Sequence, residues 1–454
     1  MASTTTATTT TEFIMSILGT NIPIALALLA LAGQFDNHLW RIILLVIQYR
    51  LMSINVDNDD DNPTSGFVGN LLLYVVTAIV IWWRPHFANI KSRPKRGCIF
   101  VTGCDSGMGK ATVLGLARSQ GSSSNQYDQI FAGCYDPKTS LASYEEELTL
   151  EEQEYVTLVA LDVTDNESVN EAAHTVHEWI YQNHKKQQGS AENNSPKKKG
   201  SSDNRRNIAD MKLEEGLVGL TGLVQFHGVA FNGPSAYMPV EMYHRQLDVN
   251  FVGTIRVVQA MLPLLKQSSK AVSGSNGTSY RSRIVLTGTG GGSCSPCPPL
   301  LTAYMSSKFA LEAYAQSLRQ ELYMTECKID LSVINPGFVK PTMLIAEGTR
   351  ISASMWTACE SKLGSTIAKD EYGNMLDHFT KYSALQPGTH VSKIVEATEH
   401  ALVSPIPRSS YKVGIDSKLA PIVGMLPTGV RELITRHGIY GILSPAGTVP
   451  GYKV

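Results

Sequence analysis

The 454-residue chain predicts an α/β fold, a doubly wound parallel sheet that begins near residue 96. Short apolar strands alternate with helices from Gly97 onward, which is the order that gives a parallel sheet with helices on both faces. A glycine-rich turn leaves the first strand and enters the first helix. The residues before position 96 hold apolar runs with no strand between them, so they predict transmembrane helices ahead of this fold.

Residues 1–95 predict a membrane anchor. The run 13–33 is apolar and free of charge, and at about 1.5 Å per residue it can cross a hydrocarbon core of about 30 Å. The run 67–83 is a second candidate span, and the shorter run 39–49 fits an interfacial helix. A buried core helix is one alternative. A cleaved signal peptide is another, but the chain has no basic stretch before the first run.

Basic residues follow the last apolar run directly: Arg84, Lys91, Arg93, Lys95 and Arg96. Basic flanks favour the cytoplasmic side of a membrane. We therefore expect the rest of the chain to face the cytosol, with the endoplasmic reticulum as the expected membrane.

Residues 96–345 carry the alternating pattern. Strands are expected at 98–101, 130–134, 155–161, 220–225 and 283–287, and helices at 110–118, 168–181 and 304–322. The polar stretches 182–216 and 267–282 cannot bury a core and predict solvated surface loops. Residues 346–454 predict a C-terminal helical region, whose part 346–405 should shape a pocket.

Composition disfavours several classes of protein. The formal net charge of -1 argues against a nucleic-acid binder, which needs a basic surface. Seven irregularly spaced cysteines indicate reduced thiols rather than a disulfide framework. The close pair Cys294 and Cys297 cannot complete a four-ligand zinc site, so we expect no metal.

The glycine-rich turn predicts a dinucleotide site. Its glycines allow a tight turn and a close approach to a pyrophosphate, and the helix N-terminus offers free N–H groups. The pattern TGxxxGxG resembles the cofactor loop of short-chain dehydrogenases/reductases, which have a Rossmann fold and use a nicotinamide cofactor. This resemblance assigns cofactor contacts to Thr102, Gly103, Asp105, Ser106, Gly107, Met108 and Gly109.

Tyr304 and Lys308 are four residues apart on a predicted helix, so their side chains share one face. A free phenol, with a pKa of about 10, exchanges protons poorly near neutral pH. A neighbouring ammonium can lower that pKa. The spacing matches the family's Tyr-xxx-Lys pair, which implies that Tyr304 carries the proton and that Lys308 also holds the nicotinamide ribose.

Two further catalytic residues follow from the same resemblance. When the loop 287–292 is aligned on its glycines, Thr289 takes the place of the family's catalytic serine and keeps a hydroxyl donor. Asn250, in the stretch DVNFVG, matches the asparagine that holds a proton-relay water in the family.

Cofactor contacts outside the glycine-rich turn are also implied by the family pattern. They fall on Asp162, Val163, Gly228, Pro336, Gly337 and Thr342. For Asp162, a helix cap or turn residue is the alternative. The family's NNAG reads Gln225-Phe226-His227-Gly228 here. We expect His227 to be a packed, hydrogen-bonded histidine, with a new catalytic group as the alternative.

Negative charge near the second strand favours NAD over NADP. Asp105 lies in the glycine-rich turn and Asp136 follows the strand, where a carboxylate repels a 2′-phosphate and can accept from a 2′-OH. The motifs TGCDSG at 102–107 and FAGC at 131–134 narrow the resemblance to retinol and hydroxysteroid dehydrogenases, and the N-terminal apolar runs are similar to those of type 2 hydroxysteroid dehydrogenases.

This branch implies a membrane-bound enzyme that oxidises a small lipophilic alcohol, such as a retinoid or steroid, with NAD. A homodimer is one possible oligomeric state of such an enzyme. Two alternatives stand beside this function. One is an NADPH-dependent reductase of a lipid carbonyl. The other is a membrane-bound pseudoenzyme that binds nucleotide without turnover.

Overall fold

The computed structural model describes residues 97–119, 127–189, 219–271, 281–292, 296–325, 327–342, 353–355, 357–359, 361 and 388–443. The predicted spans 13–33 and 67–83 and the interfacial run 39–49 lie outside these ranges. Among the helices within them, none has both the length and the apolar character that a bilayer crossing needs.

Seven parallel strands form the central sheet, in the order β3-β2-β1-β4-β5-β6-β9. Their bounds are β1 Cys98–Thr102, β2 Gln129–Cys134, β3 Val156–Ala160, β4 Leu220–Gln225, β5 Ser282–Thr287, β6 Ile329–Pro336 and β9 Ser410–Val413. The strand order reverses between β1 and β4. In doubly wound sheets, a ligand crevice opens at this point, outside the carboxyl ends of the strands.

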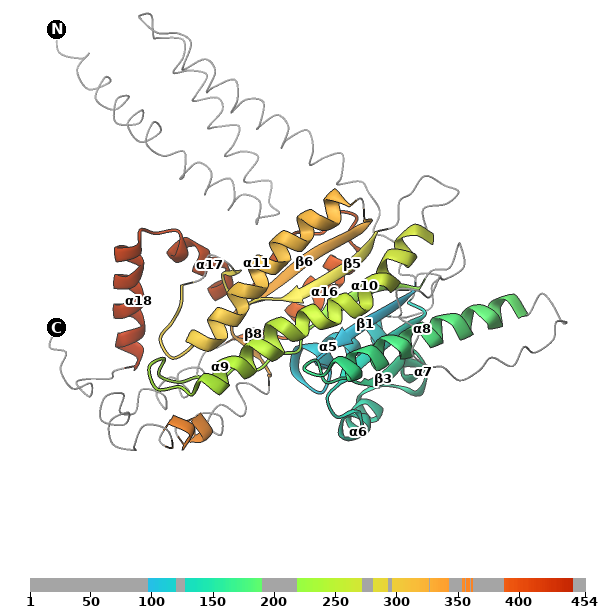
Figure 1. Ribbon diagram of the computed structural model, residues 1–454, viewed down its shortest axis with the longest axis horizontal. Coiled ribbons are helices and arrows are strands. Elements are labelled where there is room, and N and C mark those ends of the chain that lie inside the picture. Colours follow the sequence, from blue (N-terminus) through green and yellow to red (C-terminus); the bar gives the residue numbers. More distant parts are fainter. Residues whose placement is uncertain are drawn as a thin grey trace, which may run out of the picture. The chain divides into compact units, whose positions relative to one another are not determined.

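Helices cover both faces of the sheet (Figure 1). One face carries α8 (Asn166–Gly189), α10 (Gly253–Ala271) and α11 (Thr302–Met324). The other carries α5 (Gly107–Arg118) and α16 (Ser392–Val403). Successive side chains of β1 alternate between two buried cores, with Phe100 in the first and Val101 in the second. A strand buried on both faces is apolar throughout, which is why β1 reads as a continuous apolar run.

The remaining helices lie between the strands in sequence or follow the last strand. They are α6 (Pro137–Glu147), α7 (Leu150–Glu154), α9 (Val240–Leu247), a π-helical turn (Asp248–Val252), α17 (Ile415–Gly424) and α18 (Thr428–Leu443). The short strands β7 (Val339–Lys340) and β8 (Thr389–His390) pair in a separate two-stranded sheet.

The predicted strands and helices are confirmed in kind, but helix α8 is longer than expected, and helix α10 was not among the predicted helices. Helix α8 continues to Gly189 and α10 to Ala271, so each enters a stretch predicted to be loop. A helix that is already nucleated adds residues without a core of its own. The Lys185 ammonium, 4.5 Å from the centre of the Tyr181 ring one turn earlier, supports the extension of α8. Residues 190–216 and 272–280 of the predicted loops lie outside the described residues.

The C-terminal region adds core as well as surface. Helix α16, inside the segment expected to shape a pocket, packs against α5, with Ile394, Ala401 and Leu402 buried in the second core. Strand β9 then extends the sheet beside β6. The sequence predicted helices in this region without bounds, and it missed the strand β9, which carries no motif.

Candidate active site

A cavity of about 1330 Å³ opens at the carboxyl ends of the strands, at the crevice that the strand order predicts. Most predicted site residues line it: Gly103, Asp105, Ser106, Gly107, Met108, Gly109, Asp162, Val163, Gly228, Thr289, Tyr304, Lys308, Pro336, Gly337 and Thr342. Thr102, Asp136 and Asn250 are not among the lining residues, and each has another role in the structure.

The glycine-rich turn requires its glycines for steric reasons. Gly103 has φ +69°, and a Cβ atom there would lie 2.5 Å from the backbone nitrogen of His227. A Cβ atom on Gly109 would lie 2.1 Å from the carbonyl oxygen of Gly103. Helix α5 then begins at Gly107, and its N-cap Ser106 makes no side-chain capping hydrogen bond. The first N–H groups of α5 are therefore available to an anionic ligand.

The end of β2 is held by the Asp105 carboxylate. It accepts hydrogen bonds from the backbone nitrogens of Tyr135 (2.9 Å) and Asp136 (3.0 Å). The Asp136 side chain caps α6 by accepting from the backbone nitrogens of Lys138 and Thr139, and the bonds to Thr139 hold its pKa below the usual range. Asp105 thus brings negative charge to the cavity, whereas the contact predicted between Asp136 and a ribose stays a prediction.

Asp162 takes the turn role considered for it, and its contact with a cofactor stays a prediction. It lines the cavity, and its Oδ1 accepts hydrogen bonds from the backbone nitrogen (2.9 Å) and the hydroxyl (2.7 Å) of Thr164. This local turn fixes the position of the carboxylate beside Val163.

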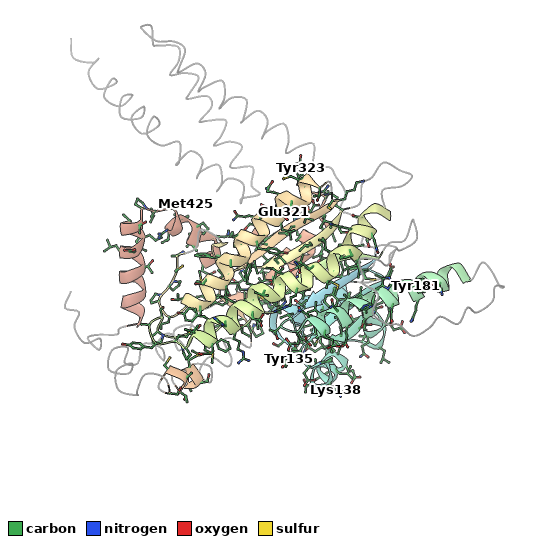
Figure 2. All side chains as sticks on the ribbon, viewed as in Figure 1. Tyr135, Lys138, Tyr181, Glu321, Tyr323 and Met425 are labelled. Atoms are coloured by element: carbon green, nitrogen blue, oxygen red, sulfur yellow. The ribbon has the colours of Figure 1, made fainter. Side chains whose placement is uncertain are left out.

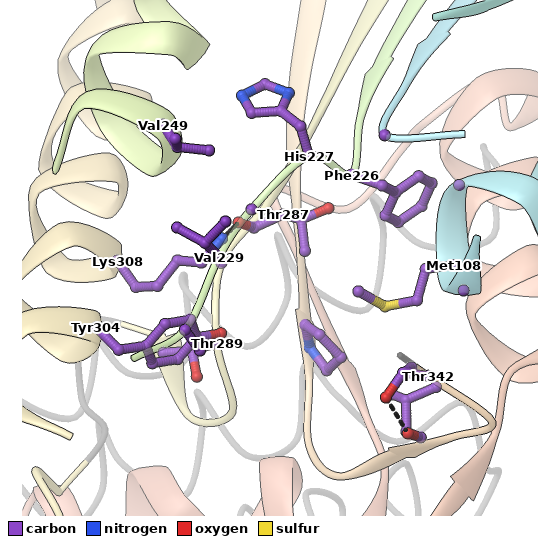
Figure 3. Close-up of a pocket in the computed structure, with 18 of the residues that line it drawn as sticks. Met108, Phe226, His227, Val229, Val249, Thr287, Thr289, Tyr304, Lys308 and Thr342 are labelled. Atoms are coloured by element: carbon purple, nitrogen blue, oxygen red, sulfur yellow. Dashed lines mark hydrogen bonds between the residues drawn. The ribbon is translucent and has the colours of Figure 1, made fainter. Parts of the chain in front are cut away.

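Tyr304 and Lys308 project from α11 towards the ends of β4 and β5 (Figure 3). The Lys308 Nζ atom lies 5.8 Å from the centre of the Tyr304 ring and donates to the carbonyl oxygen of Thr287 at 2.9 Å. Lys308 is only 4% exposed. Burial lowers its pKa to about 8, against the opposing effect of the Glu312 carboxylate. Lys308 can therefore lose its proton at a mildly alkaline pH.

Burial raises the pKa of Tyr304 above its usual value, and a hydrogen bond from the Thr289 side chain opposes that rise. This differs from the sequence-based expectation, in which Lys308 lowers the pKa of the phenol. The reason is geometric, because the Lys308 ammonium donates to the Thr287 carbonyl instead. Thr289 lies beside Tyr304 in the cavity, as the alignment on the loop glycines predicts (Figure 3).

Asn250 is fully buried on the π-helical turn. Its side chain makes two hydrogen bonds with the backbone of Val229, donating to the carbonyl oxygen (2.9 Å) and accepting from the nitrogen (2.8 Å). It also donates to the Ser307 hydroxyl (3.0 Å). A Cβ atom on Gly228 would lie 3.3 Å from Asn250 Oδ1 and 3.8 Å from Lys308 Nζ. Asn250 therefore supports the wall behind Lys308, and its part in a proton relay stays a prediction.

His227 is a hydrogen-bonded structural residue in this geometry. Its Nδ1 lies 2.6 Å from the Thr102 hydroxyl and its Nε2 lies 3.2 Å from the Thr254 hydroxyl. The Thr254 hydroxyl donates to the carbonyl oxygen of Asn250, so it accepts from Nε2–H, and Nδ1 accepts from Thr102. Burial lowers the pKa of His227 to about 3, which keeps the ring neutral. The imidazole thus ties the end of β1 to the start of α10.

The sequence prediction missed Asn335, a fully buried residue at the end of β6. Its Oδ1 accepts from the backbone nitrogen of Thr289 (3.1 Å), and its Nδ2 donates to the Ser410 hydroxyl (3.0 Å). Asn335 therefore fixes the loop that presents the Thr289 hydroxyl. Its place directly before Pro336-Gly337 was the available signal.

The far side of the cavity was also missed by sequence reasoning. It is lined by residues from α9, the π-helical turn and the start of α11, among them Arg245, Leu247, Val249, Leu301 and Met305. No motif marks these positions, because a pocket wall needs only side chains of suitable size and polarity.

The cavity residues from the glycine-rich turn, the ends of the strands and α11 fit a nicotinamide dinucleotide. The glycine turn leaves room for a pyrophosphate, the N-terminus of α5 supplies free N–H groups, and the carboxylates of Asp105 and Asp162 line the same cavity. Lys308, Pro336, Gly337 and Thr342 line the other end, beside Tyr304.

Several known proteins are similar to this chain. The family model for short chain dehydrogenases matches residues 206–350. Retinol dehydrogenase 5 of Mus musculus is 30% identical over 327 residues, covering 71% of this chain and 81% of that protein. The 17-beta-hydroxysteroid dehydrogenase type 6 of Bos taurus is 26% identical over 362 residues, covering 78% and 91%. A short-chain dehydrogenase structure from Streptomyces avermitilis aligns at a TM-score of 0.47 with 16% identity, covering 76% and 97%.

The chain therefore belongs to the short-chain dehydrogenase/reductase family. Within that family it is a member of the retinol and hydroxysteroid dehydrogenase branch, a nicotinamide-dependent oxidoreductase that acts on CH–OH groups.

Proposed function

We propose that this protein oxidises a small lipophilic alcohol with NAD. The observation that carries the proposal is the placement of Tyr304, Thr289 and Lys308 in one cavity with the glycine-rich turn. Retinol and hydroxysteroid dehydrogenases as relatives support a retinoid, a steroid or a related lipid as substrate. Apolar side chains on the far wall, such as Val249, Leu301 and Met305, suit such a molecule.

In the proposed reaction the bound nicotinamide supplies the hydride acceptor. The Thr289 hydroxyl hydrogen-bonds the substrate oxygen and holds it beside the Tyr304 phenol. Tyr304, as phenolate, takes the hydroxyl proton of the alcohol as the carbonyl forms. The hydrogen bond from Thr289 favours that phenolate by opposing the effect of burial on the Tyr304 pKa, and burial of the site excludes competing water.

Preference for NAD is proposed from the charge around β2. The Asp105 carboxylate lines the cavity beside Tyr135, and a 2′-phosphate there would meet a like charge. The test is a panel of retinoid, steroid and fatty alcohols with NAD and with NADP, read as cofactor reduction. Faster turnover with NADP, or reduction of a lipid carbonyl only, contradicts the proposal, and nucleotide binding without turnover of any substrate indicates a pseudoenzyme.

A membrane as the working site is also proposed. The apolar runs 13–33 and 67–83 support it. The described residues add apolar side chains exposed on α17 and α18, namely Ile415, Leu419, Ile422, Met425, Val430, Leu433 and Ile434. Ala420 of α17 lines the cavity, so α17 carries both exposed apolar side chains and part of the pocket wall.

The membrane proposal is tested by washing membranes that contain the full chain. We expect the protein to resist a high-salt wash and to need detergent for extraction, with residues from Gly97 onward open to protease from the cytosolic side. Release by salt alone contradicts the anchor. A sugar on Asn276, which begins an Asn-Gly-Thr sequon, contradicts the orientation.

A further inference from the structure

Glu312 is a buried acidic residue of α11 that the proposed reaction leaves without a role. It lies one turn beyond Lys308 on the same helix and is only 6% exposed. Its Oε1 has no hydrogen-bond partner among the described residues. A buried carboxylate is costly unless nearby charges compensate it. The groups around Glu312 therefore indicate how its buried carboxylate is stabilised.

The catalytic loop wraps around this carboxylate. A Cβ atom on Gly288 would lie 2.9 Å from Glu312 Oε1, and one on Gly292 would lie at the same distance. Glycines at these two positions leave the space that the carboxylate uses. Thr289 lies between them, so the carboxylate is directly behind the loop that presents the catalytic hydroxyl.

Positive charge surrounds Glu312 from two elements. On α11 its charge opposes the effect of burial on the pKa of Lys308 and on the pKa of Arg319. From β9, Lys412 Nζ approaches the same space, at 2.5 Å from a Cβ atom placed on Gly292. Of these cations, Lys308 is the one that lines the active-site cavity.

We propose that Glu312 is a positioning residue for the reaction, whose buried carboxylate supports the positive charge of Lys308 from behind the catalytic loop. This inference rests on the proposed function for the part that Lys308 plays. In the proposed function the charge of Lys308 holds the nicotinamide ribose, and its Nζ atom lies 5.8 Å from the centre of the Tyr304 ring. Glu312 supplies the compensating charge without entering the cavity.

Other groups also face Lys308. They are Tyr304 on α11, His227 after β4, the Thr287 carbonyl oxygen at the end of β5 and the Asn250 side chain on the π-helical turn. His227 is neutral and Asn250 is uncharged, so Glu312 supplies the one carboxylate among these groups. Removing its charge should therefore make Lys308 lose its proton at a lower pH.

The test uses Glu312→Gln, which keeps the shape of the side chain and removes its charge. Glu321→Gln is the matched control, because Glu321 is an exposed glutamate near the end of the same helix (Figure 2). The pKa of Lys308 is measured by pH-dependent competitive acetylation of the full-length protein, read on the Lys308 peptide by mass spectrometry. We expect a fall of about one pH unit in Glu312→Gln, the low end for loss of a nearby opposite charge, and no change in Glu321→Gln.

The second readout is the pH dependence of NADH affinity, followed by nucleotide fluorescence. In Glu312→Gln, the loss of NADH affinity at alkaline pH should begin at a lower pH than in wild type. This difference between the two proteins should vanish when both also carry Lys308→Met. A purely structural role would lower affinity at every pH in both backgrounds. If Glu312→Gln does not fold, Glu312→Ala, which leaves room for water, takes its place in both measurements.

An unchanged Lys308 pKa in a folded variant overturns the proposal, and so does an equal shift in Glu321→Gln. Loss of turnover is not used as a readout. A wild-type protein that oxidises no alcohol would refute the proposed function, while the labelling experiment would still decide whether Glu312 supports the charge of Lys308.

Discussion

The two ends of the cavity recognise their ligand by different means. At β1 and α5 the chain offers backbone groups, with glycines that let the turn approach a pyrophosphate and N–H groups at the start of a helix. At β5, β6 and α11 it offers side chains, and each is held by another side chain or by a carbonyl oxygen. The nucleotide end should therefore be sensitive to added volume, and the catalytic end to the loss of a single polar group.

This difference also orders the expected effects of substitution. Loss of the proton-carrying group should lower activity most, and loss of a hydrogen-bond donor should lower it less. Steric strain in the glycine turn should have a smaller effect, on NADH affinity, and removal of a supporting contact the smallest. Each of the following predictions tests one step of this order.

Tyr304→Phe should abolish most turnover while leaving NADH affinity within a few-fold of wild type. The phenol is the proton carrier in the proposed reaction, and general acid–base groups contribute about 10²–10⁴ in rate. The ring remains, so the packing of α11 is preserved. Steady-state rates and fluorescence titration measure the two effects, and turnover within about tenfold of wild type would remove Tyr304 from the mechanism.

Thr289→Val should lower the rate by about 10²–10³, the usual cost of removing one such donor. Valine keeps the shape of threonine and removes the hydroxyl. Thr289→Ser is the matched control, because it keeps the hydroxyl and should be as active as wild type or more so. Because Asn335 holds the backbone of residue 289 rather than its side chain, both variants should keep the loop in place. Near-normal activity of Thr289→Val would mean that the donor lies elsewhere.

The contrast between the two ends explains what sequence reasoning could predict. The sheet, the glycine turn and the Tyr304–Lys308 pair depend on local patterns, and the structure has them where the sequence predicts them. The direction of the Lys308 ammonium depends on a carbonyl oxygen 21 residues away in sequence. Asn335 meets Thr289 across 46 residues. Such contacts form only when the sheet assembles, and no local spacing reveals them.

Asp136 shows the same limit at the nucleotide end. Its position after β2 predicts a ribose contact, which stays a prediction, and the structure adds a local role because the carboxylate also caps α6. A cap needs only a neighbouring helix N-terminus, which the sequence also contained in Pro137. This local role was not among those predicted from the sequence.

Gly103→Ala should weaken NADH binding by about ten- to a hundredfold, because backbone strain of about 1–3 kcal/mol converts to that range of affinity. The new methyl group would meet the His227 backbone, and φ +69° is unfavourable for alanine. Gly429→Ala is the control, since a Cβ atom there meets nothing within 4 Å. Fluorescence titration and thermal unfolding measure the two proteins. Equal affinities would mean that the turn can shift without loss.

The smallest effect is expected at His227, where the side chain supports two elements and performs no chemistry. The folded-state pKa of about 3 lies below the usual value of 6.5. The unfolded chain therefore binds a proton between these two values that the folded protein does not, so the free energy of unfolding should fall as the pH drops below about 6.5. One such proton changes the free energy of unfolding by at most about 1.4 kcal/mol per pH unit.

His227→Gln should remove that contribution, because glutamine does not titrate and can still bond Thr102 or Thr254. The measurement is urea unfolding of both proteins at pH 7.5 and pH 5. Wild type should lose more stability between these two values than the variant does, and NADH affinity should change only a few-fold. Equal losses of stability would mean that His227 is protonated in the folded state. A loss of turnover comparable to that of Tyr304→Phe, with NADH affinity intact, would instead make His227 a catalytic group and reverse the order of effects argued above.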